Sequence, residues 1–379
     1  MADVLKGLNL LETLKDSIEK NKLSDVRDAV EDLLISRLNI GVAGERGPEK
    51  VAFINSLRGL GVEDEGAAIF PSTGPPEELA MYPNPKNADF RLFDLPAVPT
   101  KPDFDPEEYM ERFKVQRYNA VLMTFTKDLH PNSVAVWMET RSMQRDTIYF
   151  ALLASEKDTD ATLDARRKVS VELLKAQGVA RPRVFVLRPA ALEKLDFLKL
   201  LKEMEGDLPE VRAHALLMSL PAFSADIVTR KRDAFKALVW AAASLSGGVS
   251  AIPVPLVASM VDASVGLRIL SKAQTSLGLD DDSLDRLARQ RGVDAGKLKE
   301  LRSCALSAEV TKAEVKRRLS VAEKNTSTNT TRLMEMAMPL KARSVSHSFT
   351  VMLQALNSAI DDMGADAEKI VAAVIGAEK

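Results

Sequence analysis

Residues 38–51 read LNIGVAGERGPEKV, and this short stretch decides the fold class. It joins an apolar run that ends at Ala43 to a turn bracketed by Gly44 and Gly47, and then to a helical pattern that continues to Leu60. A strand, a glycine turn and a helix in that order are typical of a phosphate-binding loop. The stretch therefore predicts the beginning of an α/β domain.

Further short apolar runs follow along the chain, with helical patterns between the later ones. They are Phe90–Leu95, Ala120–Phe125, Ile148–Leu153 and Val184–Leu187. Such alternation implies crossover connections and a mostly parallel sheet that is covered by helices on both faces. The expected fold is a three-layer α/β domain over residues 37–205. The Pro- and Gly-rich residues 70–89 have no clear period, and we expect a loop there.

Helical patterns flank this domain on both sides. Two short amphipathic helices are expected in residues 1–36, and residues 206–379 read as helices with no further strand pattern. The apolar stripes of the first two helices need burial. We therefore expect residues 1–36 to join residues 206–379 in one all-helical domain.

The composition excludes several classes of protein. The 52 basic and 54 acidic residues give a formal net charge of −2, so no global field exists that would hold a nucleic acid. Cys304 is the only cysteine, which excludes an intramolecular disulfide and fits a reducing, cytoplasmic location. The three histidines have no HExxH pairing, so we expect no metal site. The first residues contain no apolar signal segment and no glycine at position 2, so we expect no lipid anchor there.

Residues 237–261 carry no charged side chain and are long enough to cross a bilayer. The glycine pair Gly247-Gly248 and the prolines Pro253 and Pro255 would divide a spanning helix and leave backbone groups unpaired. We therefore expect two buried helices around a turn, with a transmembrane segment as the alternative.

The turn after residue 43 departs from a working phosphate loop, which reads GxxxxGK[ST]. Gly44 and Lys50 match this pattern, but Glu49 replaces the second glycine and places a negative charge in the anion cradle. Two like charges about 4 Å apart repel by roughly 1 kcal/mol in water and roughly 4 kcal/mol at an intermediate dielectric. Val51 has no oxygen for magnesium, and Pro48 removes one backbone donor. The loop therefore disfavours a nucleotide.

Two later segments show similar departures from guanine-nucleotide motifs. Asp94 follows a predicted strand and matches the first position of DxxG, but Ala97 replaces the glycine. Asp158 lies where [NT]KxD places the aspartate that pairs with guanine, while Glu156 replaces the lysine that packs along the base. Residues 126–128 resemble the same motif, but they follow an earlier strand and lack the spacer residue.

These motifs define a degenerate nucleotide site. A residual site would consist of Gly44, Gly47, Lys50, Asp94 and Asp158. We predict no catalytic residue and no metal ligand. The alternative is an unrelated strand-to-helix turn with a surface lysine, but the joint order and spacing of the three segments favour the nucleotide site.

Six segments carry a resemblance to a known family over nearly the whole chain. They are residues 39–44, 53–59, 71–74, 94–96, 207–209 and 278–284. In them the chain resembles the immunity-related GTPases, interferon-inducible proteins in which a Ras-like domain is inserted into a helical domain built from both chain ends. The altered motifs, with residues 310–315 and 353–356, most resemble the Q-type or quasi-GTPase branch.

The resemblance implies a catalytically impaired GTPase-like protein that acts through protein partners in innate immunity and autophagy. It implies a cytoplasmic protein, peripheral on intracellular membranes, with autophagosomal ubiquitin-like proteins or related GTPases as partners. No cofactor is expected, although GTP or GDP with magnesium is the cofactor if residual binding survives. The alternative is an active or weakly active GTPase that oligomerises on membranes.

One four-residue pattern fits the partners that the resemblance implies. Phe197-Leu198-Lys199-Leu200 follows Asp196 and formally matches the aromatic-x-x-aliphatic ligands of ubiquitin-like proteins. The same pattern also arises on an amphipathic helix that packs against a sheet, and we favour this second interpretation.

Overall fold

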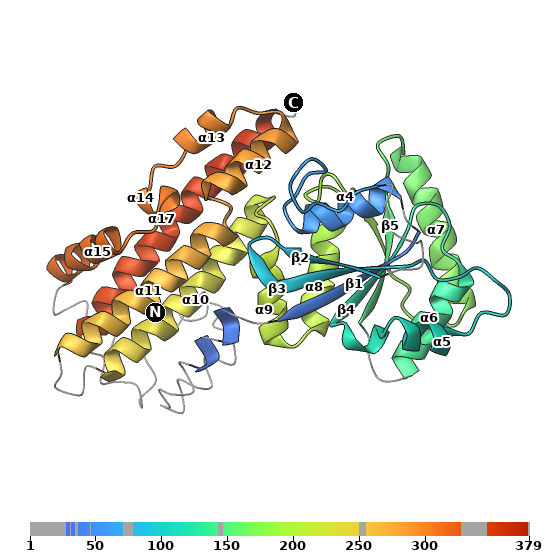
Figure 1. The fold of residues 1–379 in the computed structure, drawn as a ribbon, viewed down its shortest axis with the longest axis horizontal. Helices are drawn as coiled ribbons and strands as arrows, with labels where there is room; N and C mark the ends of the chain where they lie inside the picture. Colours follow the sequence, from blue (N-terminus) through green and yellow to red (C-terminus); the bar gives the residue numbers. More distant parts are fainter. Residues whose placement is uncertain are drawn as a thin grey trace. The chain divides into compact units, whose positions relative to one another are not determined.

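The computed structural model describes residues 28–30, 32–34, 37–45, 47–70, 79–142, 147–249, 255–326 and 347–377. The chain divides into two compact units (Figure 1). Arg37–Leu220 forms the α/β unit, and Pro221–Lys379 is grouped with residues 1–36 in the helical unit.

A six-stranded sheet is the centre of the α/β unit, with the strand order β2-β3-β1-β4-β5-β6. The strands are β1 (Leu38–Ala43), β2 (Ala80–Asn84), β3 (Asn87–Leu95), β4 (Ala120–Phe125), β5 (Ile148–Leu153) and β6 (Val184–Leu187). Only β2 pairs antiparallel, with β3, and every other pairing is parallel. The mostly parallel sheet is therefore confirmed.

The β2–β3 hairpin is the part of the sheet that the sequence pattern missed. The prediction of a loop over residues 70–89 is wrong for β2 and for the beginning of β3. The strand β2 contains Pro83, which an edge strand tolerates because one of its sides needs no ladder hydrogen bonds. Asn84 Oδ1 accepts hydrogen bonds from the backbone N–H groups of Lys86 and Asn87, and this closes the turn. Pairing with β3, rather than a local period, makes this segment a strand.

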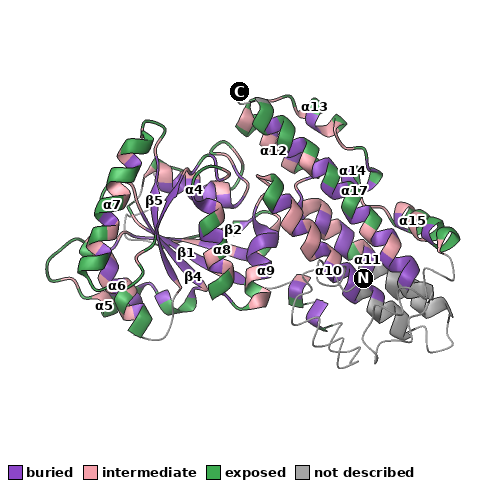
Figure 2. Ribbon diagram, turned by 180° about the vertical axis from the view of Figure 1, so that it is seen from behind, coloured by how far each residue is buried: buried purple, intermediate pink, exposed green. Residues whose placement is uncertain are grey.

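Helices cover both faces of the sheet. They are α4 (Pro48–Leu57), α5 (Pro106–Arg112), α6 (Pro131–Ser142), α7 (Asp160–Ala176), α8 (Phe197–Asp207) and α9 (Glu210–Ser219), with a short 3-10 helix at Val115–Arg117. One hydrophobic cluster joins α5, α6 and α7 to the alternate residues Val121 and Met123 of β4. On α4, Phe53 packs edge-on against Phe197 of α8, with ring centroids 6.4 Å apart. The strands between these layers are largely buried (Figure 2).

The pattern Phe197-Leu198-Lys199-Leu200 lies at the beginning of α8. Phe197 is 3% exposed and Leu200 is fully buried, so neither anchor of the formal motif is accessible. The packing-helix interpretation of this segment is therefore confirmed.

A polar network fastens the end of α4 to the loop that follows it. The Arg58 guanidinium donates hydrogen bonds to Pro83 O and Gly66 O at 3.0 and 2.8 Å. Asn55 exchanges two hydrogen bonds with the backbone of Ala68. Both side chains are buried, so these contacts satisfy polar groups that would otherwise be costly. Residues 71–74, which also carry the family resemblance, lie outside the described residues.

The helix α9 belongs to the α/β unit, although the sequence interpretation ended that domain at residue 205. It packs on β1 and β3. At its end Asn84 Nδ2 donates to Ser219 O at 3.0 Å, and Asn87 Nδ2 donates to Ser219 Oγ at 2.8 Å. The chain then leaves the α/β unit at Pro221.

The described part of the helical unit contains no strand, as expected. Its main helices are α10 (Ala225–Val249), α11 (Pro255–Ser276), α12 (Asp281–Arg291), α13 (Ala295–Glu300), α14 (Ala305–Ala308), α15 (Lys312–Asn325) and α17 (His347–Ala377). The long helix α17 packs along α10 (Figure 1). Ion pairs of Arg232 with Glu368 and of Lys236 with Asp361 join the two helices.

The uncharged segment 237–261 is divided between α10 and α11. Two helices share the segment, as predicted, but Gly247-Gly248 lies within α10, which continues to Val249. The helix α11 begins at Pro255. Proline is tolerated at the first position of a helix because the N–H group it lacks would have no acceptor within the helix. Among the described residues, no helix is long and apolar enough to span a membrane.

One buried lysine lies at the centre of the helical unit. Lys231 of α10 is 0% exposed, and its Nζ donates to Ser276 O at 2.5 Å. Burial, together with the charge of Lys272, lowers the pKa of Lys231 from 10.5 to about 7. Above pH 7 the unfolded chain therefore keeps a proton at Lys231 that the folded chain has lost.

We expect Lys231 to make the helical unit more stable as the pH rises from 7 towards 10. One proton difference corresponds to a slope of at most about 1.4 kcal/mol per pH unit. In Lys231→Met this contribution disappears, and the unfolding free energy should depend less on pH. Urea unfolding in a Trp137→Phe background, where Trp240 reports on the helical unit, measures both slopes. Equal slopes in the variant and the parent would contradict the prediction.

Candidate nucleotide site

The candidate site lies at the carboxyl ends of the parallel strands. The strand β1 lies between β3 and β4, and the chain leaves β1 for one side of the sheet and later returns on the other. Ligands of parallel sheets bind at such a switch point. Ala43 of β1 pairs with Leu95 of β3, so Gly44 and Asp94 lie close together.

Gly44 makes a close approach that no other residue would allow. Its φ is +149°, and a Cβ at this position would lie 2.3 Å from both the carbonyl oxygen and Oγ1 of Thr124. The same Thr124 hydroxyl donates to Ala43 O at 2.8 Å. The first glycine of the loop therefore has a structural role, the packing of β1 against the end of β4.

Lys50 is buried, with 2% of its surface exposed, and its Nζ contacts three oxygens of the protein. It donates to Gly44 O at 2.8 Å and to Leu95 O at 2.6 Å. It lies 2.6 Å from Asp94 Oδ1, whose side chain is 8% exposed. Two of these contacts are hydrogen bonds to carbonyl oxygens, and the third is an ion pair with the Asp94 carboxylate. The lysine that would reach a phosphate is thus neutralised within the fold.

The helix α4 begins at the position where an anion would bind. Gly47 is the N-cap, and it provides no side-chain hydrogen bond to the first turn. The Glu49 carboxylate folds back over this turn, because a Cβ on Gly47 would lie 3.5 Å from Glu49 Oε2. A carboxylate in the first turn interacts favourably with the helix dipole, and it competes with a phosphate for the same field. Arg46, which precedes Gly47, lies outside the described residues.

Asp158 lies after β5 and is held by its own loop. Its Oδ2 accepts hydrogen bonds from Ser155 N at 2.8 Å and Ser155 Oγ at 3.0 Å, and its Oδ1 accepts from Arg166 Nη1 at 2.9 Å. Burial alone would raise the pKa of Asp158, but the hydrogen bonds from Ser155 and Arg166 outweigh burial and lower it. Arg166 also donates to Thr126 O, which joins the loops after β4 and β5. A guanine edge would have to displace these contacts.

The structure brings Gly44, Lys50 and Asp94 into direct contact and leaves Asp158 in a separate network. A cleft of about 520 Å³ opens beside Gly44, and Ala97 lines it. Residues 126–128, which the sequence interpretation set aside, line the same cleft. Residues 126–128 lie beside Gly44 because β4 pairs with β1, and no local sequence motif predicts this pairing.

The donor set departs from that of a working phosphate loop with magnesium. The Lys50 donors are directed at protein oxygens, and Glu49 lies at the helix N-terminus. Val51 is a buried, apolar side chain where magnesium would need a hydroxyl. In the described part of the chain, no three His, Cys, Asp or Glu side chains are grouped as a metal site would require.

Comparison with known proteins identifies a single family over most of the chain. The model of the family "Interferon-inducible GTPase (IIGP)" matches residues 8–370. Interferon-inducible GTPase 5 of Rattus norvegicus is 30% identical, and the alignment covers 97% of this chain and 83% of the relative. The Bos taurus protein of the same name is 31% identical, over 97% and 82%. Interferon-inducible GTPase 1 of Mus musculus is 29% identical, over 74% and 71%.

The Lys50–Asp94 contact predicts a clear effect on stability without any ligand. We expect Lys50→Met to cost the α/β unit about 3–5 kcal/mol, because it leaves the Asp94 charge buried and uncompensated. The double variant Lys50→Met/Asp94→Asn should recover much of this loss. Urea unfolding in a Trp240→Phe background, where Trp137 reports on the α/β unit, measures both. A single variant as stable as its parent would show that Lys50 has no structural role.

Proposed function

This chain belongs to the interferon-inducible GTPase family, and from that premise we propose that it is a catalytically impaired member that acts by binding protein partners. In this proposal the α/β unit is retained as a folded platform, and nucleotide hydrolysis is lost. Gly44, Gly47, Lys50, Asp94 and Asp158 are what is left of the nucleotide site.

The contacts of Lys50 carry this proposal. A phosphate loop works because its lysine is available to the terminal phosphates. Here the Lys50 Nζ lies within 2.8 Å of Gly44 O, Leu95 O and Asp94 Oδ1. A triphosphate would have to compete with a buried carboxylate for the same charge, and separating a buried ion pair is costly.

Four substitutions at positions that hydrolysis needs support the same proposal. Glu49 opposes the charge of a phosphate, and Val51 offers magnesium no ligand. Ala97 lacks the flexibility of the glycine in DxxG, and Glu156 is exposed where a lysine would pack along guanine.

The proposed setting rests on the resemblance to the quasi-GTPase branch of the family. We propose that the protein acts in innate immunity and autophagy, in the cytoplasm and as a peripheral protein on intracellular membranes. Autophagosomal ubiquitin-like proteins and related GTPases are the proposed partners. A ubiquitin-like partner would have to recognise a surface other than Phe197–Leu200, since both anchors of that segment are buried.

Rebuilding the loop tests the proposal directly. By calorimetry we expect no saturable binding of GTP with magnesium to the parent protein up to about 1 mM, and no turnover. The variant Glu49→Gly/Val51→Ser restores the GxxxxGKS pattern and removes a like charge. We expect it to bind GTP at least about fivefold more tightly than the parent, because that charge opposes the ligand by roughly 1–4 kcal/mol.

Lys50→Ala in the rebuilt background is the matched control, and it should abolish the gained affinity. The contrary result is micromolar GTP binding by the parent protein that Lys50→Ala removes, accompanied by turnover. That outcome would favour an active GTPase that oligomerises on membranes.

Membrane attachment has a separate test. A peripheral protein is held by surface contacts, so washing cell membranes with alkaline carbonate should release it into the supernatant. Calnexin or another integral protein in the same sample serves as the control. Retention of this chain in the carbonate-washed pellet would contradict peripheral attachment.

A further inference from the structure

A second cavity, of about 330 Å³, lies at the amino ends of β5 and β6. Parallel strands present their amino ends at the edge of the sheet opposite to the phosphate loop, so this cavity is distinct from the candidate nucleotide site. Its walls come from α6, the beginning of β5, the end of α7, the segment that leads into β6, and the last residue of α8.

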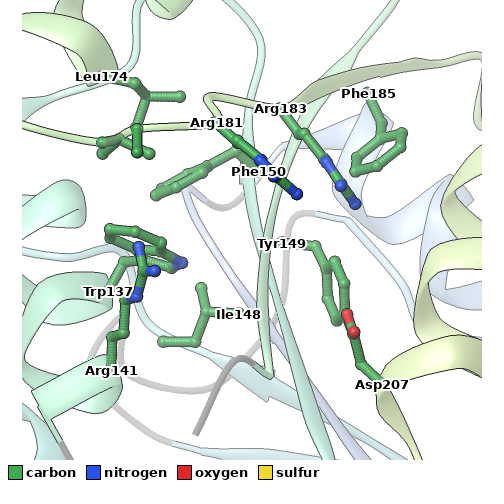
Figure 3. Close-up of a pocket in the computed structure, with 12 residues that line it drawn as sticks. Trp137, Arg141, Ile148, Tyr149, Phe150, Leu174, Arg181, Arg183, Phe185 and Asp207 are labelled. Atoms are coloured by element: carbon green, nitrogen blue, oxygen red, sulfur yellow. The ribbon is translucent and has the colours of Figure 1, made fainter. Parts of the chain in front are cut away.

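Three arginines line this cavity, and each is exposed. The Arg141 guanidinium lies over the Trp137 ring, 5.2 Å from the ring centroid. Arg183 pairs with Glu203 of α8, and both side chains of this pair are partly exposed. Arg181 has no acidic partner among the described residues. Figure 3 shows the Arg181 and Arg183 side chains extending over the cavity from the segment before β6, with Arg141 and Trp137 on the opposite wall.

Aromatic side chains form the rest of the lining. Phe150 and Phe185 are buried, and Trp137 is partly exposed. The Tyr149 hydroxyl donates to Asp207 Oδ2 at 2.9 Å, which holds that carboxylate against the wall of the cavity (Figure 3). Aromatic walls with a few polar groups at the rim are typical of sites for small organic ligands, and the volume falls at the small end of their range.

The charged side chains of the lining favour a negatively charged ligand. The lining carries three guanidinium groups and one carboxylate, Asp207, which accepts a hydrogen bond from Tyr149; Arg183 is paired with Glu203, so Arg181 is the group that an anion would reach first. Guanidinium groups present planar pairs of N–H donors that match carboxylate and phosphate oxygens. Trp137 is partly exposed, and an aromatic body packs well against such a ring, whereas Phe150 is buried beneath it with the ring centroids 6.3 Å apart.

From this arrangement we propose that the cavity binds a small organic anion, in which a carboxylate or phosphate group is carried on an aromatic body. The anionic group contacts Arg181, with Arg183 beside it, and the aromatic body packs against the exposed part of the Trp137 ring. This site is independent of the proposed function, because it lies at the other end of the strands and needs neither the phosphate loop nor Asp158.

The two tryptophans of the chain, Trp137 and Trp240, provide a local measurement. Trp240→Phe leaves Trp137, in the wall of the cavity, as the only indole. Phenyl phosphate and benzoate are the two anionic probes, and they separate a phosphate site from a carboxylate site. Phenol lacks the charge, and inorganic phosphate lacks the aromatic body. We expect a saturable change in Trp137 emission with at least one anionic probe, and at least tenfold weaker responses to phenol and inorganic phosphate.

Arg181→Ala should weaken binding of the responding probe by about tenfold, since a hydrogen bond to a charged group is lost. Arg181→Gln is a second variant that keeps most of the side-chain volume. Arg212→Ala is the matched control, because Arg212 is exposed on α9 and does not line the cavity. Thermal unfolding of each variant verifies that it is folded.

Three results would overturn the proposal. The first is no saturable response to either anionic probe up to about 10 mM. The second is an equal affinity for phenol, which would leave the arginines without a role. The third is an equal loss of affinity in the Arg212 variant and in both Arg181 variants.

Discussion

The Lys50 ammonium lies 2.6 Å from Asp94 Oδ1, and both side chains are almost completely buried. A buried charge without a partner is costly, so each member of the pair requires the other. The pair also links three elements, because Lys50 belongs to α4, Asp94 to β3, and Gly44 O accepts from the same Nζ. The phosphate loop is therefore held in place without a phosphate.

This contact separates two kinds of position in the nucleotide motifs. Gly44, Lys50 and Asp94 match the motifs, and each also has a role in packing or charge balance that needs no ligand. Positions 49, 51, 97 and 156 depart from the motifs, and the fold needs no glycine, hydroxyl or lysine at any of them. The matches at Gly44, Lys50 and Asp94 thus say little about nucleotide hydrolysis, because the fold itself needs these residues. The substitutions at positions 49, 51, 97 and 156 are more informative about hydrolysis.

The sequence predicted the parts of the fold that depend on local pattern and missed those that depend on pairing. Mostly apolar runs indicated β1, β4, β5 and β6, because a strand buried on both faces needs no alternation of polar and apolar residues. The edge strand β2 contains Pro83, and its strand character depends on pairing with β3, which the local sequence pattern does not indicate. For the same reason the end of the α/β unit was misplaced, since contacts of Asn84 and Asn87 with Ser219, far along the chain, hold α9 to the sheet. At the site, spacing located Lys50 and Asp158, but their partners depend on the approach of β3 and on the face of α7 that carries Arg166.

The distribution of charge over the two ends of the sheet differs from that of a typical nucleotide-binding fold. At the carboxyl ends, Lys50 is matched by Asp94 and Arg166 by Asp158, and Glu49 adds a further negative charge at the helix terminus. At the amino ends, three arginines line a cavity together with Asp207, which accepts a hydrogen bond from Tyr149, and one of them, Arg183, is paired with Glu203. An anion gains from uncompensated positive charge in a partly desolvated place, and not from charge that is already paired. The proposed anion site therefore lies at the end of the sheet where Arg181 has no acidic partner among the described residues, and not at the end where Lys50 and Arg166 are paired.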